Sequence, residues 1–151
     1  MKIATPKLSA DLRRATIETM VDDGELESMR LSEVVATNCN VAALQLIDVL
    51  IEDVQFTGAH FSRIVGRDVI ARRIDFSSAY LDNGMLVRVE FINCRMTGID
   101  FSRTNIHDVV FRSCKLDNAI FLHADLRRVA FIDCSLQGVD LSVAHCAAVE
   151  R

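Results

Sequence analysis

The stretch of residues 89–103, VEFINCRMTGIDFSR, contains two repeats of different length. Its apolar residues Phe91, Met96 and Phe101 lie five residues apart. Its first tetrapeptide, FINC at Phe91, returns as FRSC and then as FIDC, twenty residues later each time. One architecture has to produce both periods.

The five-residue period runs through most of the chain. From Leu26 to Cys146, 25 successive positions at this spacing carry only Leu, Ile, Val, Phe, Met, Ala, Gly or Cys. An α-helix cannot use the period, because five residues rotate about 140° beyond a full turn and scatter the apolar side chains around the helix. A straight strand cannot use it either, since an odd step moves the side chain to the opposite face. The chain must therefore bend once in every five residues.

The twenty-residue period gives the number of bends in one turn. Four five-residue sides return the chain to the same azimuth, one layer higher. The sequence therefore predicts internal columns, one of Val49, Val69, Val89, Val109 and Val129, and another of Val54, Ile74, Cys94, Cys114 and Cys134. It also predicts a shared corner made of residue types that tolerate turn geometry, namely Gly58, Ser78, Gly98, Asn118 and Gly138.

This unit, with variants such as IDFSS, IDFSR and ADLRR, resembles the pentapeptide repeat family over residues 24–148. The resemblance implies an all-β fold, a right-handed quadrilateral parallel β-helix (a pentapeptide repeat solenoid) of about six coils. With a strand spacing of ~4.8 Å, such a rod is about 30 Å long. Residues 1–23 are then an N-terminal cap or divergent coil, residues 24–148 the solenoid, and residues 149–151 a C-terminal tail.

Three regions depart from the regular pattern. Gly66 and Ala71 are small at the large inward position, but Ile64 and Val69 are large at the small one, so we expect the core volume to be conserved by repacking; the alternative is a locally flexible side near Gly66. Residues 10–19 fit two further units, ADLRR and ATIET, with MVDDG resetting the register; the alternative is a capping helix that begins at Ser9. The final LSVAHCAAVER holds no useful cap, so the last coil should either self-associate or be covered by a further segment.

Composition and charge exclude several classes of protein. The 151 residues suit one domain, half of them are apolar, and none is tryptophan. Residues 1–53 carry a net charge of −5 and residues 54–143 a net charge of +1, so neither part is a basic surface for nucleic acid. No apolar run approaches the ~20 residues of a membrane span, and the first residues do not form a secretory signal. Five cysteines without a CxxC pair indicate reduced thiols in the cytoplasm.

No constellation of residues predicts catalysis, a metal or a cofactor. Stacked cysteines could bind a soft metal, but the inward positions of Cys94, Cys114 and Cys134 favour a role in the core. The histidines and the acids before the core position fall on outward positions: His60, His107, His123, His145, Asp75, Asp100, Asp125 and Asp140. A convex rod offers no cleft where such groups could converge, and P-loop, GxGxxG and GxSxG motifs are absent. We predict a protein that is not an enzyme.

Outward apolar residues on the side that carries Phe91 are the remaining signal. We predict a protein interface formed by Leu50, Ile70, Ile92, Val110, Ala130 and Ile132, with a smaller patch at Ile120 and Leu122. The alternative is that strand propensity alone favours Val and Ile there. The expected function is a structural scaffold or protein–protein interaction module with a protein partner of unknown identity. A homodimer through a coil end or the apolar side is also expected, without direct binding of nucleic acid or membrane.

The resemblance implies a second function. Some pentapeptide repeat proteins resemble duplex DNA in width and charge, bind type II topoisomerases such as gyrase, and protect them from quinolones. Mimicry of this kind needs a strongly negative rod, whereas the regular body here carries +1. The scaffold function is therefore favoured over DNA mimicry.

Overall fold

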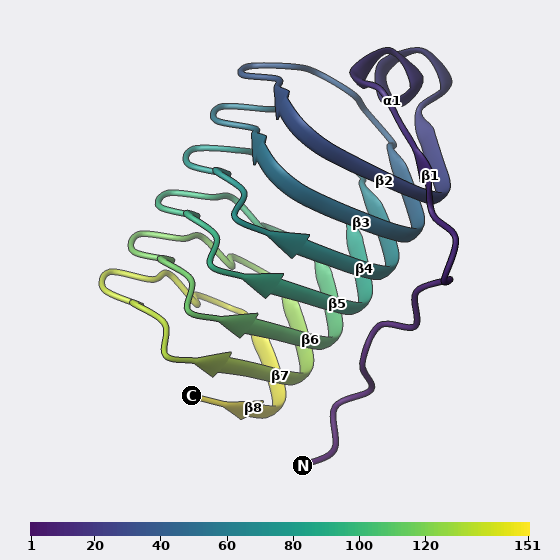
Figure 1. Ribbon diagram of the computed structural model, residues 1–151. Coiled ribbons are helices and arrows are strands. Elements are labelled where there is room, and N and C mark those ends of the chain that lie inside the picture. The colour runs from purple at the N-terminus through teal and green to yellow at the C-terminus, as the bar shows by residue number, and fades with distance from the viewer.

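The computed structural model describes residues 1–151 and shows a rod of stacked coils (Figure 1). Eight parallel strands form one sheet in the order β1 to β8. Their bounds are β1 Arg13–Arg14, β2 Glu25–Val35, β3 Gln45–Gln55, β4 Val65–Arg72, β5 Met85–Ile92, β6 Asn105–Arg112, β7 Asp125–Ile132 and β8 His145–Glu150. One helix, α1 (Ile17–Asp23), lies between β1 and β2. No helix has the length and hydropathy needed to cross a bilayer.

Each coil has four sides because the backbone bends at every fifth residue. All 25 residues at this spacing from Ser28 to Ala148 have φ between 52° and 70°, and 22 of them are not glycine. The left-handed conformation costs an ordinary residue about 1–2 kcal/mol. Hydrogen bonds to the next coil offset this cost, as where the amide of Asn38 donates to the carbonyl of Thr57 at 2.9 Å. The predicted quadrilateral parallel β-helix is confirmed.

Inward side chains form columns along the rod axis. The predicted valine column is confirmed, because its members pair in register and are buried: Val49, Val69, Val89, Val109 and Val129. Phe91 stacks on Phe111 with ring centroids 5.0 Å apart, and Phe111 stacks on Phe131 at 4.9 Å. These distances match the strand spacing of ~4.8 Å, so each ring contacts the equivalent ring of the next coil.

The N-terminal region differs from the preferred interpretation of two extra coil units. Strand β1 pairs with β2, so the ADLRR unit does extend the sheet. The next unit is helical instead, and its N-cap is Thr16 rather than Ser9. The Thr16 hydroxyl accepts the amide of Thr19 at 3.2 Å, and Gly24 ends the helix at φ 65°.

Helix α1 closes the first coil. Its residue Met20 has no exposed surface and belongs to the same hydrophobic core as the coils. A further flat coil in place of the helix would leave that core uncovered, which explains why a helix is favoured here. At the other end β8 continues to Glu150, so residues 149 and 150 belong to the last strand and not to a tail.

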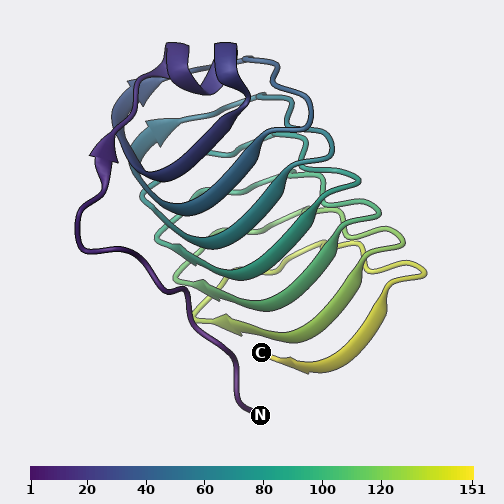
Figure 2. The same ribbon diagram turned by 90° about the vertical axis from the view of Figure 1, so that its right-hand side faces the viewer.

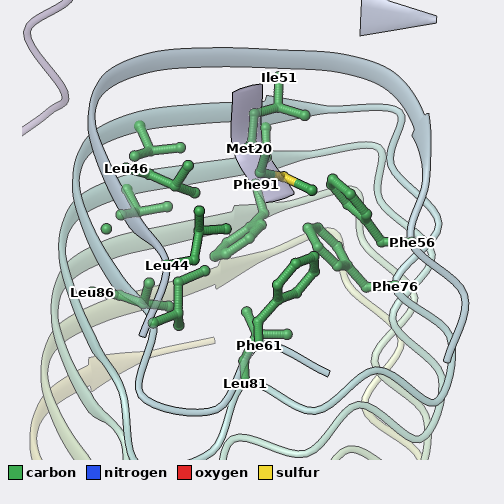
Figure 3. A pocket seen from close by; sticks show the side chains of 15 residues that line it. Met20, Leu44, Leu46, Ile51, Phe56, Phe61, Phe76, Leu81, Leu86 and Phe91 are labelled. Carbon is green, nitrogen blue, oxygen red and sulfur yellow. The ribbon is translucent and has the colours of Figure 1, made fainter. Parts of the chain in front are cut away.

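The core near Gly66 contains a small cavity of about 30 Å³ (Figure 3). Ile64 and Val69 are buried beside it, as expected from their size, but they do not fill the space that Gly66 and Ala71 leave. The prediction of conserved volume is therefore wrong at this level of the rod. All side chains that line the cavity are apolar, so it offers a water molecule no hydrogen-bond partner among them.

Residues 1–12, here called the N-terminal arm, form no helix or strand. From Met1, near β8, the arm runs along the outside of the coils to β1, so that both termini lie at the same end of the rod (Figures 1 and 2). Its direction is therefore opposite to the direction in which the coils advance. The five-residue pattern, which starts only at Leu26, gave no indication of this course.

Candidate interaction surface

The six residues of the predicted interface lie in two columns. Leu50, Ile70, Val110 and Ala130 occupy equivalent positions on successive coils, together with Glu90, and are called the first column. The second column lies two residues further along each coil and contains Glu52, Arg72, Ile92, Arg112 and Ile132. The structure therefore brings all six residues to one side of the rod.

The two columns do not form one continuous exposed patch. Ala130 is only 4% exposed, and the other five predicted residues are half-buried. Glu90 and Arg112 form an ion pair of 3.5 Å within the patch, between Ile92 and Val110 of neighbouring coils. The apolar surface is thus divided into smaller groups, and its role as an interface stays a prediction.

The next side of the rod shows the opposite composition. Its outward residues are Gln55, Asp75, Arg95, Lys115 and Ser135 in one column and Thr57, Ser77, Thr97, Asp117 and Gln137 in the other. All ten are polar, whereas six of the ten equivalent residues in the first and second columns are apolar. Outward positions of this fold therefore do not require Val or Ile. Strand propensity is a weaker explanation for the apolar side than the sequence alone suggested.

The smaller predicted patch is isolated. Ile120 shares its column with Tyr80, Asp100 and Asp140 and is half-buried, as is Leu122. His60 stacks on Tyr80 in the same column, with ring centroids 4.4 Å apart. These neighbours give this side a polar and aromatic surface rather than an apolar one.

A column of charged corner residues borders the first column. This charged corner consists of Ser28, Asp48, Asp68, Arg88, Asp108 and Arg128. Arg88 donates to both carboxylate oxygens of Asp68, at 2.7 and 2.8 Å, and Arg128 binds Asp108 in the same way. Hydrogen bonds from these arginines hold the pKa of Asp68 and the pKa of Asp108 below the usual aspartate value.

Asp48 has no arginine partner. Desolvation acts to raise its pKa, but hydrogen bonds from the hydroxyls of Ser9 and Ser28 outweigh it, so the pKa of Asp48 is also lowered. Ser9 comes from the N-terminal arm and Ser28 from the preceding coil, in β2. All three aspartates of the charged corner are therefore stabilised as anions.

The N-terminal arm binds these carboxylates through its backbone. The amides of Ala4, Lys7 and Ser9 donate to Asp108, Asp68 and Asp48, at 3.2, 3.2 and 2.7 Å. Neither partner of this contact was predicted from the sequence. The available signal was the spacing of the three aspartates by multiples of twenty residues, but no pattern in the arm showed where it would lie.

The predicted roles of the cysteines agree with the geometry. The thiols of Cys94, Cys114 and Cys134 donate to the carbonyls of Ala71, Phe91 and Phe111 at 3.4, 3.4 and 3.3 Å. Cys94 and Cys114 are buried and Cys134 is half-buried. Cys134 acts to lower the pKa of Cys114, but Cys94 and burial outweigh it and raise that pKa to about 12. The Cys114 thiol therefore stays protonated at neutral pH, as expected for a core residue.

The histidines and outward acids meet at one place, where Nε2 of His107 lies 3.5 Å from Oδ2 of Asp125. None of the four histidines is buried, and no group of three or more His, Cys, Asp or Glu has the arrangement of a metal site. Three outward aspartates instead accept the amide two residues later: Asp75 from Ser77, Asp100 from Ser102 and Asp140 from Ser142. These side chains stabilise the corners of the coil, a role beyond the solvent exposure that the sequence predicts.

A sequence profile described as the pentapeptide repeat region matches residues 85–150. The corner geometry of these residues continues without interruption back to Ser28. Residues 85–150 are therefore similar in sequence to the pentapeptide repeat family, and the coils before them share the same backbone geometry. No curated protein matches its sequence.

Solved structures share the fold at low sequence identity. QnrB1, a plasmid-mediated fluoroquinolone resistance protein, superposes with a TM-score of 0.54 at 20% identity, over 90% of this chain and 69% of QnrB1. Rfr23, a pentapeptide repeat protein from the cyanobacterium Cyanothece 51142, superposes with a TM-score of 0.60 at 16% identity, over 89% and 91% of the two chains. At these identities the comparison establishes the fold alone.

Proposed function

We propose that the chain is a protein–protein interaction module without catalytic activity, and that the apolar side of the rod is its contact surface. The observation that carries the proposal is the contrast between adjacent sides. Six of the ten outward positions on this side are apolar and the other four are charged, whereas all ten are polar on the next side; the six apolar residues are Leu50, Ile70, Ile92, Val110, Ala130 and Ile132. Apolar surface that the fold does not require is typical of a binding site.

The second column offers the most direct test, because Ile92 and Ile132 lie far from the charged corner. Replacing both with Lys places two charges in the proposed interface without touching the core. We expect the double variant to lose at least tenfold in affinity for its partner, or in self-association if the partner is a second copy. Quantitative capture from extracts of cells that express the chain, together with sedimentation of the purified protein, measures both.

The matched control carries Thr97→Lys and Gln137→Lys. These residues face outward on the polar side, five residues after the two isoleucines along the coil. The control should bind and sediment like the unmodified chain. Equal behaviour of the two double variants would contradict an interface on the apolar side.

A homodimer through the same side is the self-associated form of this proposal. A reducing compartment such as the cytoplasm suits the chain, because all five of its cysteines are free. The second candidate, protection of a topoisomerase, is suggested by the description of QnrB1 as a fluoroquinolone resistance protein. It is less favoured, because two of the three acids of the charged corner are paired with arginines and residues 54–143 have a net charge of +1.

A further inference from the structure

The N-terminal arm matches the charged corner coil by coil. From Lys7 to Ala4 the arm advances three residues, about 10 Å in extended chain. Their acceptors Asp68 and Asp108 are two coils apart, which is also about 10 Å. The arm amides therefore follow the spacing of the coils, although the arm pairs with side chains and not with a strand.

The coil between these two acceptors is matched as well. Its corner residue is Arg88, whose side chain has no acceptor atom. Between Lys7 and Ala4 the arm carries Thr5 and Pro6, the only proline of the chain. Proline has no amide hydrogen, so of the two arm residues that span this coil only Thr5 has a backbone donor.

The arm also covers the corner. The side chains of Asp68 and Asp108 are 16% and 11% exposed, whereas Asp53, at the next corner of the coil, is 47% exposed. On the arm, the half-buried residues Ile3, Pro6 and Leu8 are apolar, and the residues between them are exposed. The arm thus directs amides and apolar side chains to the rod and its remaining side chains to solvent.

We propose that the charged corner is a recognition surface for an extended polypeptide segment, here called the arm-binding surface, which the N-terminal arm occupies in the free protein and a partner segment of the same chemistry displaces. Such a segment donates amides to Asp48, Asp68 and Asp108 and places apolar side chains over the rod. The proposal rests on the proposed function, because it names the kind of partner and the element that competes with it.

The arm is suited to exchange. It has no backbone–backbone hydrogen bonds to the coils over residues 1–12, whereas each coil is bonded to its neighbours throughout. Its release leaves every ladder of the rod intact. Because the arm is covalently tethered beside the arm-binding surface, it acts at a high effective concentration. A partner must therefore bind more tightly than the free arm sequence or meet a released arm.

The test uses the full chain with Ile3→Asp and Leu8→Asp. These substitutions place negative charge on the arm beside the aspartates of the charged corner and should release the arm from the arm-binding surface. The probe is a fluorescent synthetic peptide of residues 1–12. Its anisotropy should show at least tenfold tighter binding to this variant than to the unmodified chain, in which the arm competes. A peptide with the same two substitutions should not bind. The single variant Leu8→Asp should give an intermediate affinity.

Two corner variants, made in the Ile3→Asp, Leu8→Asp chain, test where the peptide binds. Asp108→Ala should weaken peptide binding at least tenfold, because one amide acceptor is lost. Asp133→Ala makes the same change at an exposed corner with the same positive φ and should leave the affinity unchanged. Equal binding to the released and unmodified chains, absence of binding to both, or insensitivity to Asp108→Ala would each overturn the proposal.

The outcome is independent of the test of the proposed function. The Ile92 and Ile132 variants probe the second column, which is not part of the arm-binding surface. If the Ile92 and Ile132 variant loses partner binding but the arm peptide does not bind, the proposed function stands and the arm-binding surface is ruled out. If the arm peptide binds but the Ile92 and Ile132 variant behaves like the unmodified chain, the arm-binding surface is supported as a contact site and the second column is ruled out as one.

Discussion

Single residues adopt conformations in this rod that they would not select alone. Arg73, Arg88 and Arg128 have φ of 52–54°, in the region usually reserved for glycine and asparagine. Each has its backbone fixed between two coils, so the neighbouring layers and not the residue type determine the bend. Residue identity matters more where a side chain would point into the core, as at the glycines of the inner face.

Gly66 and Gly84 give a paired prediction at this scale. A Cβ atom on Gly66 would lie 3.0 Å from Cδ2 of Leu86, a flexible side chain beside the cavity that can move into it. A Cβ atom on Gly84 would lie 2.7 Å from the backbone carbonyl oxygen of Ile64, which cannot move aside. We expect Gly66→Ala to stabilise the protein by about 0.5–1 kcal/mol. We expect Gly84→Ala to destabilise it by about 1–3 kcal/mol.

Urea unfolding at equilibrium measures both free energies. The two substitutions make the same chemical change one coil apart, so their difference isolates the space available in the core. A destabilised Gly66→Ala variant would show that Leu86 cannot use the cavity.

At the scale of elements, helix α1 is the piece that ends the repeat. A coil exposes its inward residues unless another layer covers them, and Met20 supplies that cover at the N-terminal end. Met20→Ala should lower the free energy of unfolding by about 2–3 kcal/mol, because a fully buried side chain is removed next to an existing cavity. Val21→Ala, on the exposed face of the same helix at 47% exposure, should change it by less than about 0.5 kcal/mol. Similar losses in the two variants, measured by thermal and urea unfolding, would contradict the capping role.

The N-terminal arm should respond to acid. The pKa of each of Asp48, Asp68 and Asp108 is lower in the folded protein than the ordinary value of 3.8. Their stabilisation of the arm is therefore complete above the ordinary aspartate pKa and is lost as the pH falls through the lower folded-state values. The facing charges are Arg88 and Lys7 at Asp68, Arg128 and His107 at Asp108, and Asp68 at Asp48.

Nuclear magnetic resonance can follow this release through the arm amides. The proton shifts of Ala4, Lys7 and Ser9 should titrate together with their acceptor carboxylates, with midpoints below pH 3.8. The amide of Val89, inside β5, should keep its shift over the same range and thereby show that the rod remains folded. Midpoints at or above 3.8 would show that the arm amides are not bound to ionised aspartates.

The whole molecule is a rod of mixed charge. Acidic and basic side chains pair between neighbouring coils, as in Arg73 with Asp53 at 2.7 Å and Arg88 with Asp68 at 2.7 Å. A DNA-like surface would instead need acids that are repeated without such partners along one face. The rod is therefore a poor electrostatic match for a groove that binds phosphates.

This charge distribution predicts the result of a topoisomerase assay. The purified chain should leave the supercoiling activity of DNA gyrase unchanged and should not raise the quinolone concentration that halves it. The measurement is a gel assay of supercoiling over a series of quinolone concentrations. Concentration-dependent protection would reverse the order of the two proposed functions. The same assay with Arg88→Glu and Arg128→Glu would then show whether added negative charge strengthens the effect.

The sequence by itself determined the periods, the inward and outward positions, and hence the stacked columns of valine, phenylalanine and cysteine. These follow from short-range geometry, because each unit repeats the same bend and each coil contacts only its neighbours. Tertiary structure alone decided where the N-terminal arm lies, that α1 replaces a coil, and that a cavity remains beside Gly66. Each of these depends on contacts between residues far apart in the chain, such as Ala4 with Asp108 or Met20 with the core, and no local period encodes such contacts.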